Sequence, residues 1–276
     1  MTLQLKKAER KKAKIRLGLS GPSGFGKTYS GLLIAKGLVG DWAKIALIDT
    51  ENGSGELYSD LGDYNVITLE APYSPERYIE AIKVCENAGM ECIIVDSITH
   101  EWDGKGGCLD IQNQLGGRYQ DWAKVTPRHD AFIQAILTSK CHVITTVRRK
   151  QDYEMTEVNG KKQVQKIGTK EVTREGFEYE LTMNLEFVND KHLAKASKDR
   201  TSLFMGQPEF IPGIDTGEKI RQWCESGAEL PEPTKEQFEG LLSYLKGTPD
   251  QAEKAKQALK KYKLSTEQLK QIDQVL

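Results

Sequence analysis

The feature that most constrains this chain lies at residues 21–28, which read Gly-Pro-Ser-Gly-Phe-Gly-Lys-Thr. They fit the pattern G-x-x-x-x-G-K-[ST] at every required position. Such a loop points successive backbone N–H groups inward, and the helix that starts within it adds its positive dipole end to the same place. A buried strand over 15–19 and a helix over 29–39 are predicted on either side, which a chance glycine-rich turn would not explain. The sequence therefore predicts a phosphate-binding loop.

Different residues of the loop are expected to contact different parts of a nucleoside triphosphate and its metal ion. Lys27 is expected to reach the β- and γ-phosphates, and the Thr28 hydroxyl to ligate Mg²⁺. ATP and Mg²⁺ are therefore the predicted ligands. The predicted nucleotide contacts are Gly21, Pro22, Ser23, Gly24, Phe25, Gly26, Lys27, Thr28 and Tyr29.

A second diagnostic strand, over residues 91–97, is an apolar run that closes on Asp96. Many buried strands end in aspartate, so the pattern alone is weak. Its place about 70 residues after the loop, with a strand and a helix between, makes it the Walker B pattern. We expect the Asp96 carboxylate to hold Mg²⁺ beside Thr28.

The general base is not where many P-loop ATPases carry it, directly after the Walker B aspartate. That position holds Ser97, which cannot act as a base. A predicted buried strand over 44–49 leads into Glu51, and parallel sheets place their chemistry at the carboxyl ends of strands. Glu51 is therefore the predicted base, with Glu101 as the second candidate.

Polar residues also follow a predicted strand over 141–147. Thr146 is expected to sense the γ-phosphate. The cations after it are expected to contact DNA or the nucleotide of a neighbouring subunit; they are Arg148, Arg149 and Lys150. Lys198 and Arg200 are further candidates for reaching a nucleotide across a subunit boundary, and an internal salt bridge is their alternative.

The segment 98–126 contains two glycine pairs, which predict a mobile excursion. Trp102 and Trp122 stand among cations in it, and this pattern suits stacking on unpaired bases. An equally supported alternative is a buried helical stripe at i, i+4 and i+7, formed by Leu115, Tyr119 and Trp122.

A β-hairpin is predicted around Asn159-Gly160, between strands over 151–158 and 161–167. Residues 166–170 are a candidate DNA-facing loop, although a solvated hairpin edge explains their lysines equally well. A further strand is predicted over 178–188.

The chain is expected to have three parts. Residues 1–13 form a basic arm, which could lie on a phosphate backbone, be held by a neighbouring subunit, or form a solvated, frayed helix. Residues 14–229 form the α/β core. A stiff Pro-Glu-Pro linker then opens a helical module at 230–276, with helices predicted over 234–246, 250–261 and 265–276.

Composition and charge limit the partners and the cellular compartment that we expect for this chain. The net charge is −1, so contact with a nucleic acid must come from local patches. No apolar run could span a bilayer, and the basic N-terminus lacks the apolar region of a signal peptide. The five cysteines form no C-x-x-C pair and the four histidines are scattered, so we expect reduced thiols, no zinc site and a cytoplasmic protein without membrane contact.

Taken together, these features resemble RecA-like recombination ATPases, in particular the short phage-encoded RecA-core proteins that include single-strand annealing proteins. The resemblance covers about residues 14–210. It rests on the loop at 21–28, the strand ends at 48–51 and 93–97, and the strand that closes near Thr146.

The resemblance implies a RecA-like P-loop core with a mainly parallel sheet flanked by helices, a hairpin extension and the helical module. It supports Glu51 as the catalytic base, acting with Lys27. It also implies ATP hydrolysis on single-stranded DNA during recombination or annealing, in a host-cell cytoplasm. The partners would be further copies of the chain, and single-strand binding protein or other replication and recombination proteins.

Three other functions use the same loop. The chain could be a helicase loader or packaging motor that depends on a partner, or a nucleotide-gated binding module with negligible hydrolysis. A small-molecule kinase ranks last, because the sequence shows no acceptor pocket or lid signature.

Overall fold

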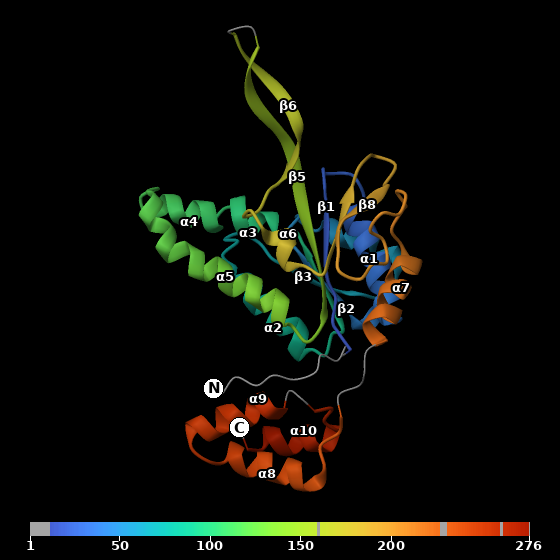
Figure 1. Cartoon of the computed structure of the whole chain (residues 1–276), viewed down its shortest axis with the longest axis vertical. Helices are drawn as coiled ribbons and strands as arrows, with labels where there is room; N and C mark the ends of the chain where they lie inside the picture. The colour runs from blue at the N-terminus through green and yellow to red at the C-terminus, as the bar shows by residue number, and fades with distance from the viewer. Residues whose placement is uncertain (1–11, 159–160, 227–230, 260–261, 276) are drawn as a thin grey trace. The chain divides into compact units, whose positions relative to one another are not determined.

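The computed structural model describes residues 12–158, 161–226, 231–259 and 262–275, and the chain divides into two compact units (Figure 1). One unit is Lys14–Trp223, and the other combines Met1–Ala13 with Cys224–Leu276. The unit boundary thus falls before the predicted module boundary at 230. Residues 1–11 of the predicted basic arm, and the predicted turn residues Asn159 and Gly160, lie outside the described residues.

The larger unit is built on one sheet with the order β3-β2-β4-β5-β1-β7-β8. Every neighbouring pair in that order is parallel except β7 and β8, so the predicted mainly parallel α/β sheet is confirmed. β6 pairs only with the outer part of β5. The strands are β1 Arg16–Gly21, β2 Ile45–Asp49, β3 Asn65–Thr68, β4 Cys92–Asp96, β5 His142–Val158, β6 Lys161–Glu171, β7 Met183–Phe187 and β8 Ala194–Asp199.

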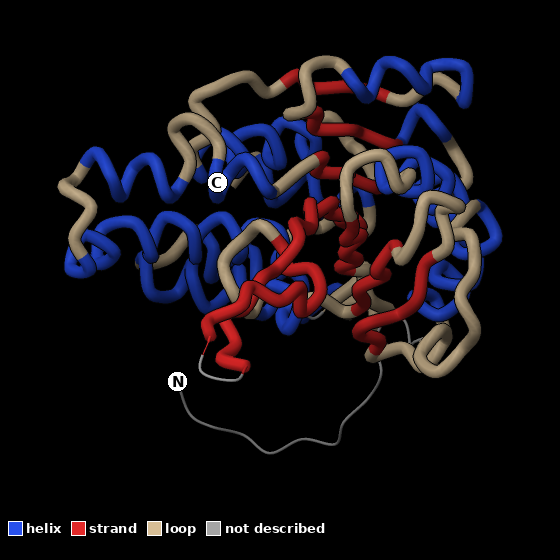
Figure 2. The backbone as a smooth tube through the Cα atoms, turned by 90° about the horizontal axis from the view of Figure 1, so that it is seen from above, coloured by secondary structure: helices blue, strands red, loops and turns tan. Residues whose placement is uncertain are grey.

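Helices cover both faces of this sheet (Figures 1 and 2). Successive strand residues point to opposite faces, so Ile94 faces α1 while Ile93 and Val95 join the core beneath α2 and α5. In that core the rings of Tyr78 and Phe132 lie 5.2 Å apart. The first six α-helices of this unit are α1 Lys27–Val39, α2 Pro75–Asn87, α3 Thr99–Asp103, α4 Cys108–Gln114, α5 Trp122–Thr138 and α6 Phe177–Glu180.

A seventh helix, α7 Ile214–Glu225, packs closely on α1. A Cβ added at Gly37 would lie 2.1 Å from the carbonyl oxygen of Ile214, and one added at Gly217 would lie 2.1 Å from that of Ile34. Glycine is needed at both positions because backbone meets backbone there. Three short 3-10 helices complete the unit: η1 Trp42–Lys44, η2 Ser54–Leu61 and η3 Tyr119–Asp121.

The described part of the smaller unit has its own small apolar core. Phe238, Leu245, Ala255, Leu259 and Ile272 are buried together. Its helices are α8 Lys235–Leu245, α9 Pro249–Leu259 and α10 Thr266–Asp273, which agree with the three predicted helices. No helix among the described residues is both long and apolar enough to cross a membrane.

The hairpin strands predicted over 151–158 and 161–167 are confirmed, since they lie in β5 and β6, which pair antiparallel. β5 also includes the core strand predicted over 141–147 and runs unbroken for 17 residues. Two other local predictions need correction. The segment 98–126 is largely helical rather than an irregular excursion. The strand predicted over 178–188 begins only at Met183, because α6 occupies the residues before it.

Candidate nucleotide-binding site

A cavity of about 520 Å³ lies at the carboxyl ends of the central strands, the place where open parallel sheets bind ligands. The strand register builds it: Asp49 pairs with Asp96, and Gly21 pairs with Arg148. Glu51 follows shortly after Asp49 and therefore reaches the same place. The predicted residues that border the cavity are Ser23, Gly24, Gly26, Lys27, Thr28, Tyr29, Glu51, Asp96 and Arg148.

The loop has the geometry that its glycines allow. Gly24 and Gly26 adopt φ angles of 81° and 89°, a left-handed conformation that side chains disfavour. Gly26 precedes α1 and provides no side-chain cap, so the first-turn N–H groups of α1 are available to an anion. The Lys27 ammonium donates to the carbonyl oxygen of Pro22 at 2.8 Å, and its burial lowers the pKa of Lys27. These features fit phosphate binding.

Asp96 is almost fully buried and takes two hydroxyl hydrogen bonds. Thr28 donates to one carboxylate oxygen at 2.6 Å, and Thr146 donates to the other. Burial raises the pKa of Asp96, and the two hydrogen bonds oppose that rise. Thr146 is itself fully buried and does not border the cavity, so it reaches the site only through Asp96, and its role in sensing a γ-phosphate stays a prediction.

The residues predicted to hold Mg²⁺ have suitable chemistry. The Thr28 hydroxyl and the Asp96 carboxylate are adjacent oxygen donors at the edge of the cavity. Mg²⁺ prefers oxygen ligands and is usually held by one or two carboxylates together with substrate phosphates. The pair therefore fits the ion.

Glu51 is held by two neighbours. The Arg148 guanidinium donates to both of its carboxylate oxygens, with Nε at 2.9 Å from Oε1. The Ser97 hydroxyl donates to the same Oε1 at 3.2 Å. Ser97 cannot be a base, but it helps to position the residue that was predicted to be one.

Glu101, the second candidate base, is remote from this chemistry. It is fully buried beside His129 and Cys108 and does not border the cavity. That candidate is therefore wrong. Glu101 lies on α3, which starts shortly after Ser97, and its side chain contacts Cys108 of α4 and His129 of α5 instead of the phosphate-binding loop.

The tryptophans predicted to meet DNA contact each other. The rings of Trp102 and Trp122 stack at 5.5 Å with an interplanar angle of 18°. The alternative of one helical stripe with Leu115 and Tyr119 is wrong, because Gly116 and Gly117, with φ angles of 124° and 72°, follow α4 and separate these residues from α5. Tyr119 is 92% exposed, so it belongs to no core.

The two other cations predicted after Thr146, Arg149 and Lys150, differ in their ion pairs and in their exposure to solvent. Arg149 donates to Thr169 and pairs with Glu171 and Glu186, so its guanidinium is directed inward. Lys150 pairs with Asp103 at 3.1 Å and remains largely exposed.

Lys198 and Arg200 do not form the alternative salt bridge in the described structure. Both donate to the carbonyl oxygen of Tyr179, and neither borders the cavity. Their action on a neighbouring subunit stays a prediction.

Several residues that border the cavity were not predicted. Tyr58 packs edge-on against Tyr29 with ring centres 5.6 Å apart, and Ile211 and Pro212 add apolar surface. His192 adopts a left-handed φ of 62° and approaches the loop, with its Nδ1 3.0 Å from the carbonyl oxygen of Phe25. No sequence pattern predicted these contacts. Tyr58 lies in the short helix η2, His192 in the turn between β7 and β8, and Ile211 and Pro212 in the connection from β8 to α7.

A family model described as AAA domain matches residues 13–209 of the chain. No curated protein matches it. The matched range contains the loop, both acidic strand ends and the whole sheet. The chain therefore belongs to the AAA domain family and is a P-loop ATPase.

Proposed function

We propose that the protein binds and hydrolyses ATP with Mg²⁺ and acts on single-stranded DNA in recombination or strand annealing. The observation that carries this proposal is the continuity of β5. One strand contacts the nucleotide site with Thr146 and Arg148 and then continues into the long β5–β6 hairpin (Figure 1).

The base of the hairpin is tied to the nucleotide site by the backbone of Arg148. Its N–H donates to the Thr99 hydroxyl at 3.0 Å, and its carbonyl accepts from the Val172 N–H at 2.8 Å. Its side chain meanwhile holds Glu51. A ligand that displaces the hairpin would therefore disturb the residue that positions the base.

The charged and aromatic residues at the hairpin suit the binding of single-stranded DNA. Residues 148–171 contain seven basic and four acidic residues. A groove of about 580 Å³ at the hairpin base is bordered by Trp102 with Lys150, Lys170 and Arg174. Cations that follow a backbone, together with an aromatic ring on which a base stacks, are typical of single-strand binding.

The hydrolytic step follows from the site residues. Glu51 orients a water molecule and accepts its proton as the oxygen attacks the γ-phosphorus, and the bond from that phosphorus to the bridging oxygen breaks. Lys27 and the loop amides stabilise the charge on the transferring group. Bound Mg²⁺, held by Thr28 and Asp96, would supply positive charge for the same phosphates.

Turnover by this route requires Arg148 to release Glu51. The γ-phosphate of a bound ATP would bring a further anion into the same cavity and would compete for the guanidinium. Arg148 is therefore the proposed direct sensor of the γ-phosphate, with Thr146 acting through Asp96.

Assembly is part of the proposal. In a homo-oligomer, Lys198 and Arg200 would exchange their bonds to Tyr179 for contacts with the nucleotide of a neighbouring subunit. Single-strand binding protein and other replication or recombination proteins are the further proposed partners. The α8–α10 module is the proposed surface for them, because it has a core of its own.

Anisotropy of a labelled oligonucleotide tests the DNA contact. Trp102→Ala is expected to weaken binding by about 1–3 kcal/mol, the usual value of one stacked base. Trp42→Ala is the matched control, because Trp42 is also partly buried but packs on Tyr64, far from the hairpin in sequence. Affinity should also fall as salt rises.

Two results would contradict the proposal. One is equal affinity of the two tryptophan variants, provided that both keep the unfolding midpoint of the wild type. The other is a failure of the ATP-bound protein to bind single strands at all, which would favour the partner-dependent loader.

A further inference from the structure

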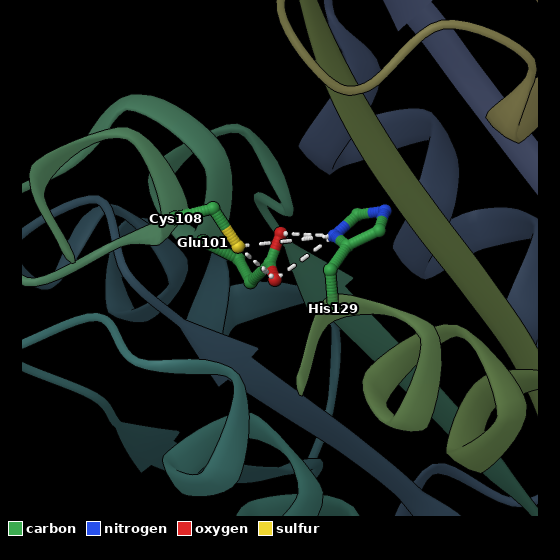
Figure 3. A group of neighbouring side chains, drawn as sticks. All are labelled: Glu101, Cys108 and His129. Carbon is green, nitrogen blue, oxygen red and sulfur yellow. Dashed lines mark hydrogen bonds and ion pairs between the residues drawn. The ribbon is translucent and has the colours of Figure 1, made fainter. Parts of the chain in front are cut away.

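We propose that Glu101, Cys108 and His129 form a structural zinc site. The three residues come from the three successive helices α3, α4 and α5, and their side chains converge on one point (Figure 3). Their potential ligand atoms all lie within 4.8 Å of one another. The scatter of the histidines along the sequence concealed this grouping.

The distances between the ligand atoms fit a metal ion. Cys108 Sγ lies 3.1 Å from Glu101 Oε1, His129 Nδ1 lies 3.0 Å from the same oxygen, and the sulfur and nitrogen are 4.0 Å apart. A point equidistant from these three atoms is about 2 Å from each. That is the length of Zn–N and Zn–O bonds, and a small outward shift of the sulfur gives the Zn–S length of about 2.3 Å.

The donor set points to zinc rather than to a hard cation. A thiolate, an imidazole and a carboxylate are the three ligand types that Zn²⁺ takes, whereas Mg²⁺ and Ca²⁺ take oxygen ligands. The ring of His129 turns Nδ1 toward the other two side chains and Nε2 away from them (Figure 3). Coordination through Nδ1 therefore needs no rotation of the ring.

Burial indicates a structural role. Glu101 and Cys108 are fully buried and His129 is 3% exposed, so a substrate could not reach an ion held between them. The described side chains supply three ligands, so a water molecule would take the fourth position, and burial rather than a fourth side chain would keep a substrate from the ion. His129 also borders a surface cavity of about 520 Å³, so one of the three ligands lies beside a space from which an ion could enter.

The proposed ion would stabilise the helices that support the nucleotide site. α3 begins just after Asp96 and Ser97, and Glu101 is part of it. Two neighbours of Glu101 on α3 reach that site: His100 Nδ1 lies 2.8 Å from the Thr50 hydroxyl, and the Thr99 hydroxyl accepts from the N–H of Arg148. Zinc would hold α3 to α4 and α5 and thereby fix both contacts.

Cobalt titration of the full chain tests the proposal. Co²⁺ is added to the chelator-treated wild type, and we expect one equivalent to produce a thiolate-to-cobalt charge-transfer band. Co²⁺ at Thr28 and Asp96 would give no such band, because those ligands are oxygens. Zinc should then displace the cobalt and raise the unfolding midpoint.

Two cysteine variants show which thiolate produces the charge-transfer band. Cys108→Ser is expected to lose it, and Cys85→Ser, which alters another buried free cysteine, is expected to keep it. A wild type without the band would overturn the proposal without any variant and would leave the cluster as a hydrogen-bonded ion pair. A band that persists in Cys108→Ser would also overturn it. If Cys108→Ser does not fold, His129→Gln provides the same comparison through an altered band.

Discussion

Arg148 at β5 binds both carboxylate oxygens of Glu51, the residue that follows the end of β2. Both side chains border the cavity above the phosphate-binding loop, and both are partly exposed to it. While the pair is intact, the guanidinium occupies the oxygens that would orient a water molecule. Separation of the pair is therefore the event that links nucleotide binding to hydrolysis in the proposed mechanism.

Glu51→Gln should lower turnover strongly but measurably and keep ATP binding. The amide retains the shape of the side chain but cannot accept a proton, and general bases contribute about 10²- to 10⁴-fold to rate. Steady-state phosphate release and equilibrium binding of a fluorescent ATP analogue measure the two properties separately. Turnover equal to that of the wild type would show that another residue is the base.

Arg148→Ala should lower turnover, because the loss of the proposed contact between its guanidinium and the γ-phosphate outweighs the release of Glu51. Its effect should not add to that of Glu51→Gln. Residues in direct contact show interaction energies of about 0.5–3 kcal/mol in double-mutant cycles. The cycle is measured as kcat for the wild type, the two single variants and the double variant. Strict additivity would mean that the contact between Arg148 and Glu51 has no part in hydrolysis.

Thr146→Val should destabilise the fold more than Thr145→Val. Both threonines are fully buried neighbours on β5, so the two variants have matched burial and shape. Thr146 donates to the buried Asp96 carboxylate, whereas Thr145 makes only a 3.4 Å bond to the Leu17 carbonyl oxygen. Loss of a donor to a buried charged group costs about 1–3 kcal/mol.

Denaturant unfolding at neutral pH measures both threonine variants. Thr146→Val should also raise the Mg²⁺ concentration needed for half-maximal turnover, since it frees one oxygen of the proposed ligand from its positioning bond. Equal unfolding free energies of the two variants would contradict this assignment.

His142→Asn should reduce the loss of stability in acid. Burial lowers the pKa of His142 to about 3, with Lys14 and Arg16 adding to the effect, and its Nδ1 accepts from the Ile15 N–H at 3.2 Å. Between pH 6.5 and 3 the unfolded chain therefore binds a proton at this residue that the folded chain does not. The resulting stability is present above pH 6.5 and falls as the pH drops toward 3.

Asparagine offers a similar acceptor that does not titrate in this range. The free energy of unfolding of His142→Asn should consequently have a shallower dependence on pH from 6.5 to 3. Parallel curves for the variant and the wild type would show that His142 is not the titrating group.

The sheet and the phosphate-binding residues could be predicted because local patterns determine them. The phosphate-binding loop is recognisable from its glycines and its Lys-Thr pair. Each of the strands that end at Asp49 and Asp96 is recognisable as an apolar run followed by an acidic residue. Parallel pairing then brings their ends together without further information, and so Glu51 was placed correctly beside the cavity.

Other contacts could not be predicted because they depend on connections whose path no pattern specifies. The approach of His192 to the loop follows from the turn between β7 and β8, and the meeting of His129 with Glu101 follows from the packing of α5 on α3. The partner of Thr146 was also missed, because the register of β5 against β4 decides it.

In the proposed function, single-stranded DNA stimulates ATP hydrolysis by this chain. The most direct test is steady-state hydrolysis with and without a single-stranded oligonucleotide at two salt concentrations, with Lys27→Ala as the blank. We expect a stimulation that weakens at the higher salt concentration and is absent from Lys27→Ala. Equal rates with and without DNA, from protein that demonstrably binds ATP, would contradict it.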